Sequence, residues 1–333
     1  MKTINLIGAG LIGQERLKAV TKLRQRNLAV RVGAVHDPFH PTLSDLAKTH
    51  QFAVSDSLDE LLAKPCDLLI LACPHDIAAA TACRALELGH NVLLEKPLGR
   101  NLSEATQIAA AAKHPSQLHV GLNYRFMPGV VALLQDCAAA TFGQTISVSM
   151  VLGHGGKPGD ERTWKLDQER CGGGALLDPG IHLLDLITQI TTEPVTVAGT
   201  TTWKGFWKTG IEEHVHLLLS TPTFAIQLQT SVVRWRSHFE IAVLGTEGYG
   251  LLTGRGRSYG KQSYRRGPRW GWKQAGDQAS SEQVIVEDNC EDSFADELAS
   301  CLGLPTNIRA HVATLPEVLK VMVLYDNIRH HFG

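Results

Sequence analysis

The sequence predicts an α/β fold in two parts. The N-terminal part is a doubly wound parallel sheet, and the C-terminal part is an α+β domain with a large, mostly antiparallel open sheet. Over residues 1–122, short apolar runs alternate with stretches of helical periodicity, as parallel strands joined by helices do. After Met127, long runs alternate between polar and apolar residues, which is typical of antiparallel strands with one covered face.

The length of 333 residues exceeds what one hydrophobic core normally organises, so we expect two domains, over residues 1–122 and 123–333. The net charge of −1 gives no reason to expect nucleic acid or an acidic membrane as a partner, and no apolar run has the length of a membrane span. The seven cysteines form no C-x-x-C pair and no secretory signal precedes the first strand; both favour a cytoplasmic protein.

Five apolar runs of the first domain predict buried strands: Thr3–Ile7, Ala29–Val35, Asp67–Ala72, Asn91–Leu94 and Leu118–Leu122. Helices are expected between them, at Leu11–Arg26, Asp76–Leu88 and Ser103–His114. Gly89 ends the second of these helices, and Ser103 is the expected N-cap of the third.

The second domain begins with a helix over Pro128–Ala139 and an alternating strand over Gln144–Leu152, before a glycine-rich loop at 153–174 and a helix to about Gln189. Further strands are expected at Val195–Trp203, His214–Leu219, Phe224–Val233 and Phe239–Leu244. Two helices, Cys290–Leu302 and Leu315–His331, close the chain.

A glycine-rich turn, Gly8-Ala9-Gly10-Leu11-Ile12-Gly13, joins the first strand to the first helix. In that position G-x-G-x-x-G is typical of a Rossmann-type dinucleotide-binding domain. Gly8 permits the tight turn, Gly10 lets the backbone approach a pyrophosphate at the helix N-terminus, and Gly13 lets helix and strand pack closely. The alternative is an ordinary glycine turn.

Asp37 ends the second strand, where a carboxylate accepts hydrogen bonds from the hydroxyls of the adenosine ribose. It would repel a 2′-phosphate, and Pro38-Phe39 supplies no cation to offset that charge, so we expect NAD rather than NADP. A cationic His36 would weaken this preference. The alternative is that Asp37 only starts an Asp-Pro turn.

Glu95, Lys96 and Pro97 follow at the carboxyl end of the fourth long strand, the edge at which α/β sheets bind ligands. Pro97 fixes the backbone after Lys96, and a cis peptide bond fits there. The alternative is a solvated Glu–Lys pair, which is less common at a buried strand end.

Residues 171–186 read CGGGALLDPGIHLLDL. Three consecutive glycines cost backbone entropy, so we infer that the backbone closely approaches something there. Asp178 and His182 follow, four residues apart. The alternative is that Asp178-Pro179 is an N-cap with proline at the first helical position, and that His182 is a core histidine with satisfied hydrogen bonds.

Together these motifs resemble the glucose–fructose oxidoreductase/inositol dehydrogenase (Gfo/Idh/MocA) family of NAD(P)-dependent enzymes, over the whole chain. The resemblance rests on three elements: Gly8–Gly13, Glu95-Lys96-Pro97, and Gly172-Gly173-Gly174 followed by Asp178, His182 and Asp185. One departure is visible: family members usually read P-x-x-x-H after the third long strand, whereas here the residue four after Pro74 is Ala78. That position is commonly a packing contact on the nucleotide side.

The resemblance implies an NAD-dependent oxidoreductase that transfers a hydride between nicotinamide and a secondary hydroxyl of a sugar, nucleotide sugar or cyclic polyol. It implies that Asp178 and His182 face nicotinamide and substrate, with Lys96 opposite them from the first domain. Neutral His182 suits a general base, since the imidazole pKa lies near the operating pH. Lys96 would stabilise the developing alkoxide, and Asp178 would orient the imidazole or hold a neighbouring hydroxyl.

The remaining site residues follow from the motifs and the resemblance. The expected cofactor contacts are Gly8, Gly10, Leu11, Ile12, Gly13, Asp37, Cys73, Pro74, Glu95, Lys96 and Asn123. Tyr124, Arg125 and Trp164 are candidate substrate contacts, with loop packing as the alternative for Trp164. We expect no metal, because the other histidines show no ligand spacing.

Residues 254–273, GRGRSYGKQSYRRGPRWGWK, combine seven basic residues and four aromatic ones with no acidic residue. Three interpretations stay open: a solvated or subunit-contact loop, an anion clamp for a substrate phosphate or carboxylate, and nucleic-acid binding. The family resemblance also leaves two other functions open, an NAD-dependent glycosidase that works by transient oxidation and a dinucleotide-binding regulator without activity. It further implies a homodimer or homotetramer formed through the sheet of the second domain.

Overall fold

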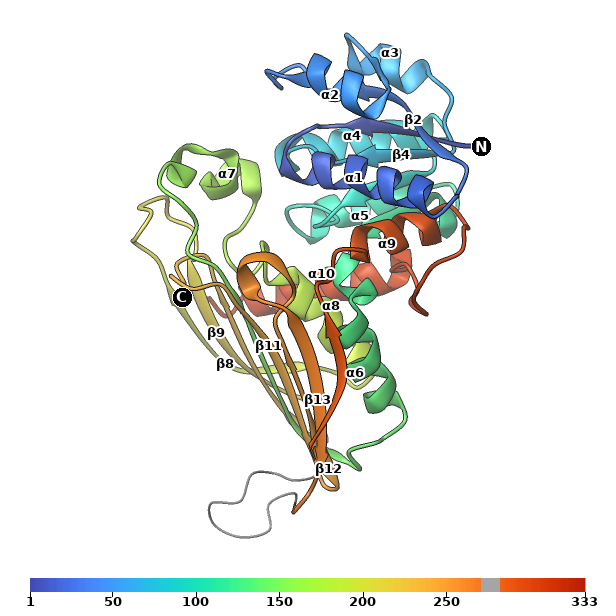
Figure 1. Cartoon of the computed structure of the whole chain (residues 1–333). Helices are drawn as coiled ribbons and strands as arrows, with labels where there is room; N and C mark the ends of the chain where they lie inside the picture. The colour runs from blue at the N-terminus through green and yellow to red at the C-terminus, as the bar shows by residue number, and fades with distance from the viewer. Residues whose placement is uncertain (271–281, 333) are drawn as a thin grey trace. The chain divides into compact units, whose positions relative to one another are not determined.

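The computed structural model describes residues 1–270 and 282–332 (Figure 1). The chain divides into two compact units. Unit 1 comprises Met1–Phe126, Glu169–Gly172 and Asp292–Met322, and unit 2 comprises Met127–Gln168, Gly173–Glu291 and Val323–Gly333. Unit 1 thus includes residues 123–126, 169–172 and 292–322, which the sequence-based division assigned to the second domain.

Unit 1 contains the doubly wound parallel sheet that the sequence predicts. Its strands are β1 (Lys2–Ile7), β2 (Val30–His36), β3 (Ala53–Val54), β4 (Leu68–Leu71), β5 (Val92–Glu95) and β6 (Leu118–Gly121). They lie in the order β3-β2-β1-β4-β5-β6, and all the pairs are parallel. The predicted strands are confirmed to within one residue at each end; the two-residue β3 was not predicted.

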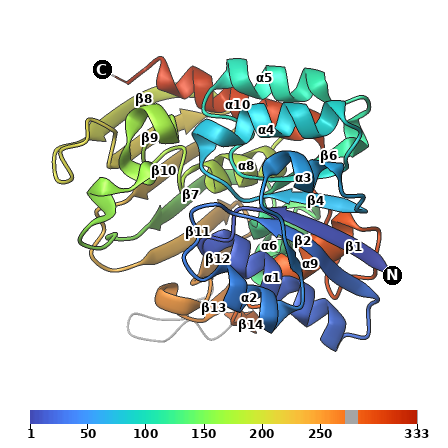
Figure 2. The same cartoon turned by 90° about the horizontal axis from the view of Figure 1, so that it is seen from above.

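Helices cover both faces of this sheet. The helices of the first 126 residues are α1 (Leu11–Gln25), α2 (Leu43–His50), α3 (Leu58–Ala63), α4 (His75–Glu87) and α5 (Leu102–Ala111), with 3₁₀ turns η1 (Pro115–Gln117) and η2 (Asn123–Phe126). Helices α1 and α9 (Ser293–Cys301) pack together, as do α4 and α5, and Figure 2 shows the two pairs on opposite sides of the sheet. Because α9 contributes Ala295, Leu298 and Ala299 to the core of unit 1, this late helix belongs to the first unit.

Two predicted helix starts were wrong. Asn101, not Ser103, caps α5, because its side-chain oxygen accepts a hydrogen bond from the backbone N–H of Glu104 (2.9 Å). The helix predicted from Cys290 begins three residues later, at Ser293, since Cys290 has a φ of +55°, outside the right-handed helical region.

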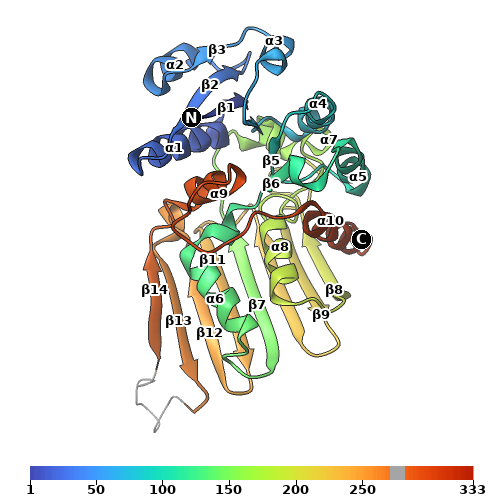
Figure 3. The same cartoon turned by 90° about the vertical axis from the view of Figure 1, so that its right-hand side faces the viewer.

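Unit 2 is built on a large sheet that is antiparallel except for one pair, as predicted. Its strands are β7 (Thr145–Gly153), β8 (Thr196–Trp203), β9 (His214–Ser220), β10 (Ala225–Ser231), β11 (His238–Gly245), β12 (Gly248–Thr253), β13 (Gln262–Pro268) and β14 (Gln283–Asp288). Their order is β14-β13-β12-β11-β7-β10-β9-β8, and β7 and β10 form the parallel pair. Helices α6 (Pro128–Ala138) and α8 (Ile181–Ile190) lie over one face of it (Figure 3).

The remaining helical segments are short except for the last. They are η3 (Asp160–Arg162), η4 (Trp164–Leu166), α7 (Gln168–Cys171), η5 (Arg257–Tyr259) and α10 (Leu315–Arg329), and α10 contributes to both units. Within the described residues, no helix combines the length and the apolarity that crossing a lipid bilayer requires.

The second face of the large sheet is open. Along β9, Val215, Leu217 and Leu219 are buried, whereas His216 and Leu218 are exposed. A shallow depression lies on this sheet around Gly199, His216 and Gln227. The alternation predicted from the sequence is therefore present, with one covered and one uncovered face.

The basic and aromatic stretch at 254–273 forms mainly a strand, so its interpretation as a loop was wrong over β13; residues 271–273 lie outside the described residues. Gln262 and Tyr264 of β13 are fully buried. The basic residues of the stretch pair largely with carboxylates: Lys261 with Glu287, Arg265 with Glu282, Arg266 with Asp136 and Arg269 with Glu247. The charges of these four residues are thus at least partly balanced within the protein, while Arg255 lies over the ring of Tyr259 (3.8 Å from its guanidinium carbon to the ring centroid).

Candidate functional site

The turn between β1 and α1 has the geometry expected of its three glycines. Gly8 has a φ of +90°, and a β-carbon there would lie 2.4 Å from the carbonyl oxygen of Ala72. A β-carbon on Gly13 would lie 2.1 Å from the carbonyl oxygen of Gly8, so helix and strand do pack closely. Around Gly10 nothing lies within 4 Å of an added β-carbon. The backbone at Gly10, the N-cap of a 15-residue helix without an acidic first turn, is thus open to an anionic ligand.

Asp37 lies directly beside this turn. Its Oδ2 accepts a hydrogen bond from the backbone N–H of Ala9 (2.8 Å), and its Oδ1 accepts one from the N–H of Phe39 (3.0 Å). The second bond is the Asp-Pro turn that the alternative interpretation expected, and the first links Asp37 to the glycine-rich turn. Cys73 follows β4 next to Gly8, and burial, together with the charges of Asp76 and Asp37, raises the pKa of its thiol to about 12.

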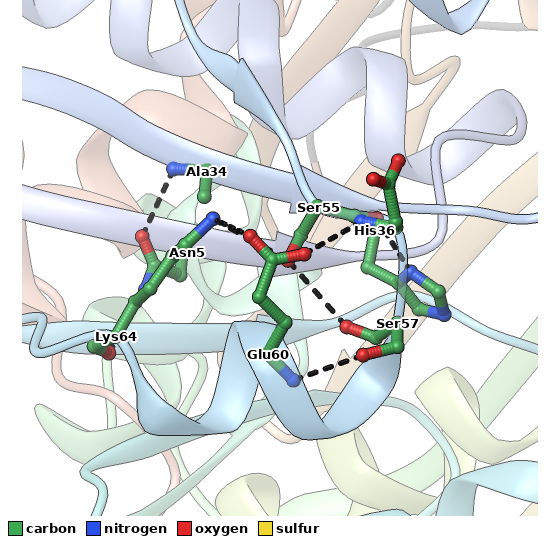
Figure 4. A network of polar contacts seen from close by, with 8 residues as sticks. Asn5, Ala34, His36, Ser55, Ser57, Glu60 and Lys64 are labelled. Carbon is green, nitrogen blue, oxygen red and sulfur yellow. Dashed lines mark hydrogen bonds and ion pairs between the residues drawn. The ribbon is translucent and has the colours of Figure 1, made fainter.

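A polar network holds the end of β2 in place (Figure 4). Asn5 of β1 accepts a hydrogen bond from the N–H of Ala34 and donates one to the carbonyl of Lys64. His36 donates a hydrogen bond through Nδ1 to the carbonyl of Ser55 (2.9 Å), which fixes the orientation of its ring. The strand that ends in Asp37 is therefore anchored from β1 and from the loop before α3.

Glu95, at the end of β5, is bound by an arginine. Arg16 of α1 donates through Nε to Glu95 Oε1 (2.6 Å), and its Nη2 lies 2.7 Å from Oε2 of Glu297 on α9. A β-carbon on Gly121 would lie 2.8 Å from both Arg16 Nη2 and Glu95 Oε2. The alternative of a solvated Glu–Lys pair was therefore wrong. Lys96 is half-buried, and the expected cis bond between Lys96 and Pro97 is confirmed.

One guanidinium serves two carboxylates in this cluster. Arg16 and Glu297 are each 1% exposed. The pKa of Glu297 is raised to about 7. Burial is the main cause, the Glu95 carboxylate also raises the pKa, and Arg16 and Arg125 act in the opposite direction. The pKa of Arg16 is raised despite its burial, because both carboxylates favour its charge. The cluster links α1, β5 and α9, and Lys96 is the residue after its Glu95.

The three residues at the start of the second predicted domain are buried. Asn123 donates to Ser293 Oγ of α9 (3.2 Å). Arg125 pairs with Glu317 (3.1 Å) and lies 3.1 Å from His311 Nε2. Tyr124 is 4% exposed. Asn123 and Arg125 thus attach η2 to later segments of unit 1; their contacts with cofactor or substrate remain a prediction.

Each glycine of the 172–174 run has its own close neighbour. Gly172 has a φ of +82°, and a β-carbon on it would meet Arg100. One on Gly173 would lie 2.5 Å from the Tyr325 hydroxyl, and one on Gly174 would lie 1.9 Å from the carbonyl oxygen of Glu212. The close approach inferred from the sequence is therefore an approach to other parts of the protein.

Glu212 fixes the turn that leads to Asp178. Its Oε1 accepts a hydrogen bond from the N–H of Gly174 (2.9 Å), and its carbonyl accepts one from Ala175 (2.8 Å). Helix α8 begins at Ile181 with Gly180 as its N-cap, so the alternative that Asp178 is the N-cap was wrong. Asp178 is half-buried, and His182 in the first turn is 5% exposed.

Asp178 lines a pocket within unit 2. The other lining residues come from the loop after β7, from η4 and from the segments before β9 and after β10: His154, Gly156, Asp160, Lys165, Leu166, Gly174, Trp207, Ile211 and Val232. An indole ring beside carboxylate, imidazole and ammonium groups suits a polyhydroxylated ring, whose hydroxyls need donors and acceptors and whose C–H face stacks on an aromatic.

Sequence reasoning missed His154. Burial lowers its pKa, the charges of Lys165 and Arg255 lower it further, and Asp178 acts in the opposite direction. Its Nδ1 accepts a hydrogen bond from the N–H of Gly156 (3.2 Å), so a neutral ring carries its proton on Nε2. A histidine just after the end of a strand, inside a glycine-rich loop, was the available signal.

Trp207, rather than the predicted Trp164, provides the aromatic wall of the pocket. Glu213 is fully buried and accepts hydrogen bonds from the backbone N–H groups of Gly205, Phe206 and Trp207 (3.2, 2.8 and 2.7 Å). The Trp207 Nε1–H points to the carbonyl of Val232 (3.4 Å). Trp164 lies one residue before the pocket-lining Lys165, and its contact with substrate remains a prediction.

The chain is similar in sequence to known proteins. The chain is 27% identical to the rhizopine catabolism protein MocA of Rhizobium meliloti over 58% of each chain. The first curated relatives are matched over 53–58% of their length, so the chain spans little more than half of them.

Two solved structures share the fold over 99% of this chain. A levoglucosan dehydrogenase in complex with NADH and levoglucosan has a TM-score of 0.83, 16% identity and 96% coverage of its own chain. KijD10, a 3-ketoreductase from Actinomadura kijaniata in complex with NADP and TDP-benzene, has a TM-score of 0.80, 16% identity and 98% coverage.

Two family models match the chain. Residues 2–122 match the oxidoreductase family with an NAD-binding Rossmann fold, and residues 132–249 match the GFO/IDH/MocA C-terminal domain. The first match covers the open turn at Gly10, and the second covers Asp178, His182 and the pocket of unit 2. The chain therefore belongs to the Gfo/Idh/MocA family of oxidoreductases.

Proposed function

We propose that this protein is an NAD-dependent oxidoreductase that transfers a hydride between nicotinamide and a secondary hydroxyl of a sugar, nucleotide sugar or cyclic polyol. The observation that carries the proposal is the pocket in which His154, Asp178, Lys165 and Trp207 converge. The levoglucosan dehydrogenase that shares the fold supports this class of substrate. Lys165 would suit an anionic substituent on the ring, because its ammonium group lines the pocket.

The residues of unit 1 fit a dinucleotide, since the space over Gly10 is open and Asp37 accepts hydrogen bonds beside it. Gly8, Gly10, Leu11, Ile12 and Gly13 would hold the pyrophosphate, and Asp37 the adenosine ribose. Cys73, Pro74, Glu95 and Asn123 complete the proposed contacts. When bound, NAD supplies the hydride acceptor or donor; the chain supplies the proton transfer and the charge stabilisation.

For that transfer, Lys96 donates a hydrogen bond to the reacting oxygen and stabilises negative charge on it. His182 takes the hydroxyl proton in oxidation and returns it in reduction. Asp178 orients the imidazole or holds a neighbouring hydroxyl, and His154 donates a hydrogen bond to the substrate through Nε2. Tyr124, Arg125 and Trp164 stay secondary proposals for substrate contact.

The catalytic proposal is tested on Lys96→Met, His182→Gln and Asp178→Asn, with a panel of sugars, nucleotide sugars and cyclic polyols as substrates. We expect near-normal melting temperatures and retained NAD binding in all three. Lys96→Met should lose roughly two to three decades in rate, and His182→Gln roughly two to four, with a smaller loss at high pH where hydroxide replaces the base. The rate loss of Asp178→Asn should lie between those of the other two variants.

A core role for His182 predicts the opposite result. Its replacement would then lower stability by about 1 kcal/mol or more and leave the rate per folded molecule unchanged. Melting temperature and rate, measured on the same samples, separate the two, and His330→Ala, on the exposed end of α10, serves as the control. Stability loss without a rate defect in these variants would disprove the active-site assignment.

The preference for NAD over NADP rests on Asp37. NADH should bind more tightly than NADPH, because the 2′-phosphate would meet the Asp37 carboxylate. Asp37→Ala should narrow the difference, whereas Asp45→Ala on the exposed surface of α2 should not change it. Fluorescence titration with both cofactors measures this, and equal or better NADPH affinity in the unchanged protein would contradict the preference.

We also propose that the protein forms a homodimer or homotetramer through the open face of its large sheet. The exposed Leu218 and Leu244 on its strands support this assignment, because exposed apolar groups on a sheet favour cover by a partner. Light scattering at micromolar concentration tests it, and a monomer would contradict it. A cytoplasmic location is part of the proposal, supported by the free thiols of Cys66, Cys73, Cys83, Cys137 and Cys301.

A further inference from the structure

Two histidines on β9 lie side by side on the open face of the large sheet. His214 and His216 are two residues apart, so both side chains point to the same face of the strand. Their Nε2 atoms are 2.7 Å apart, and their ring centroids are 4.7 Å apart. Neither lines the pocket that contains Asp178.

The Nε2 contact is one that a metal ion can replace. Two nitrogens at 2.7 Å share a single proton, so at least one of them is a lone-pair acceptor. A divalent ion about 2.0–2.1 Å from each nitrogen would set them roughly 2.9 Å apart at a right angle and roughly 3.3 Å apart in tetrahedral geometry. The rings need to separate by only a few tenths of an ångström, which small side-chain rotations supply.

A third donor lies on the neighbouring strand. Gln229 of β10 is paired in register with His216, and its amide lies 3.4 Å from Nε2 of His214. Because the oxygen and nitrogen of a carboxamide exchange places by a 180° flip, the Gln229 oxygen can face the same point. Two imidazole nitrogens and one carboxamide oxygen then converge from two adjacent strands.

We propose that His214, His216 and Gln229 form a binding site for a divalent transition-metal ion, completed by water. Imidazole ligands favour Cu²⁺, Zn²⁺ and Ni²⁺ over Mg²⁺ and Ca²⁺. The site lies on the sheet face that we propose as the subunit interface, but it is argued from the side chains of one chain and needs no part of the proposed catalytic activity. Among the described residues no group of three histidine, cysteine or acidic side chains is placed to hold a metal, so this site is a two-histidine one with exchangeable water ligands.

The electrostatics set the strength of the site. Burial lowers the pKa of His214, and the neighbouring His216 and Arg234 lower it further. Arg234 also repels an incoming cation, so binding should be reversible and weaker than at a four-ligand structural zinc site.

The test uses the full chain without an affinity tag, stripped with a chelator and titrated calorimetrically with Cu²⁺, Zn²⁺ and Mg²⁺. We expect one Cu²⁺ or Zn²⁺ per chain, with Cu²⁺ tighter, and no binding of Mg²⁺. His214→Ala and His216→Ala should each lower the affinity at least tenfold, and Gln229→Ala by less. The electron paramagnetic resonance spectrum of the Cu²⁺ complex should show coupling to two nitrogens.

The control is His330→Ala, which removes an exposed histidine just after the end of α10, outside the large sheet. It should leave the affinity unchanged. Melting temperatures of the metal-free variants confirm that each is folded, and His216→Gln provides a more conservative change. Absence of saturable binding, or an affinity unaffected by His214→Ala and His216→Ala, would overturn the proposal.

Discussion

The two glycine-rich turns of this chain look alike in sequence and differ in what surrounds them. In the first, β-carbons on Gly8 and Gly13 would collide with backbone, but one on Gly10 would meet nothing within 4 Å. In the second, β-carbons on Gly173 and Gly174 would both collide with neighbouring groups of the protein. The first turn therefore leaves one place open for a ligand, and the second uses its glycines for internal packing.

A glycine can be required because its surroundings are crowded or because a ligand needs the space above it. The sequence alone does not distinguish these two cases, but the structure does. A glycine in a crowded place serves stability, and its replacement is felt in folding. A glycine with open space above it has no packing role, and where it also lies at a helix N-terminus, as Gly10 does, the space can admit an anionic ligand. Substitutions in the two turns should therefore affect different measurements.

The largest effect is expected for Gly174→Ala. The new methyl group would lie 1.9 Å from the Glu212 carbonyl oxygen, and this backbone is held by the hydrogen bonds that Glu212 makes to Gly174 and Ala175. We expect a loss of more than about 3 kcal/mol in the free energy of unfolding. Urea denaturation measures it.

Gly199→Ala in β8 is the matched control, because nothing lies within 4 Å of a β-carbon there. It should change stability by less than about 0.5 kcal/mol. If Gly174→Ala were as stable as Gly199→Ala, the turn would have space for a methyl group. Internal packing would then not explain the glycines at 172–174.

The next largest effect is expected at Glu297, which pairs with Arg16 of α1, the helix that follows the first turn. The pKa of Glu297 is raised to about 7 in the folded protein, compared with about 4.3 in the unfolded chain. Between these two pH values the folded protein holds a proton on Glu297 and the unfolded chain does not. The stability from this group is fully present below about pH 4.3 and is lost as pH rises through about 7. Its size is on the order of 3 kcal/mol.

Glu297→Gln should remove this loss of stability at high pH, since the glutamine amide has nearly the same shape as the glutamate side chain but cannot ionise. The difference in unfolding free energy between variant and unchanged protein, measured at pH 5 and pH 8, isolates the group from other titrations. Glu60→Gln is the control, because hydrogen bonds, chiefly from Lys64, lower the pKa of Glu60 to about 2, outside this range. A Glu297→Gln protein with an unchanged pH dependence would contradict the assignment.

The sequence was most informative where a pattern is local. The strands of unit 1 are continuous apolar runs, and the roles of Gly8 and Gly13 follow from a turn between strand and helix, so both were predicted. The docking of α9 on α1 was not, because helical periodicity shows that a helix has an apolar face but not which core it covers. The pairing of Arg16 with Glu95 joins residues 79 positions apart and has no local signal.

Other features were missed although a signal was present. In β13 the buried Gln262 and Tyr264 alternate with partly exposed residues, but the density of basic residues suggested a loop. His154 stood in a glycine-rich segment without a motif partner, and only the fold brings it to the pocket of Asp178. The motifs that carry the proposed catalytic residues were visible in the sequence, whereas the pocket lined by Asp178 depends on contacts between distant loops.

The smallest effect on stability, and the sharpest test of the comparison, is expected for Gly10→Ala. Gly10 has φ −64° and ψ −163°, extended backbone outside the left-handed region that favours glycine, and its surroundings are open, so stability should change by less than about 0.5 kcal/mol. The methyl group would, however, occupy the space through which the pyrophosphate approaches the helix N-terminus. NADH affinity should fall at least tenfold, about 1.4 kcal/mol, while Gly199→Ala leaves it unchanged. Fluorescence titration with NADH on folded samples of both variants decides the matter: if Gly10→Ala binds NADH normally, the open space at the first turn is not the dinucleotide site.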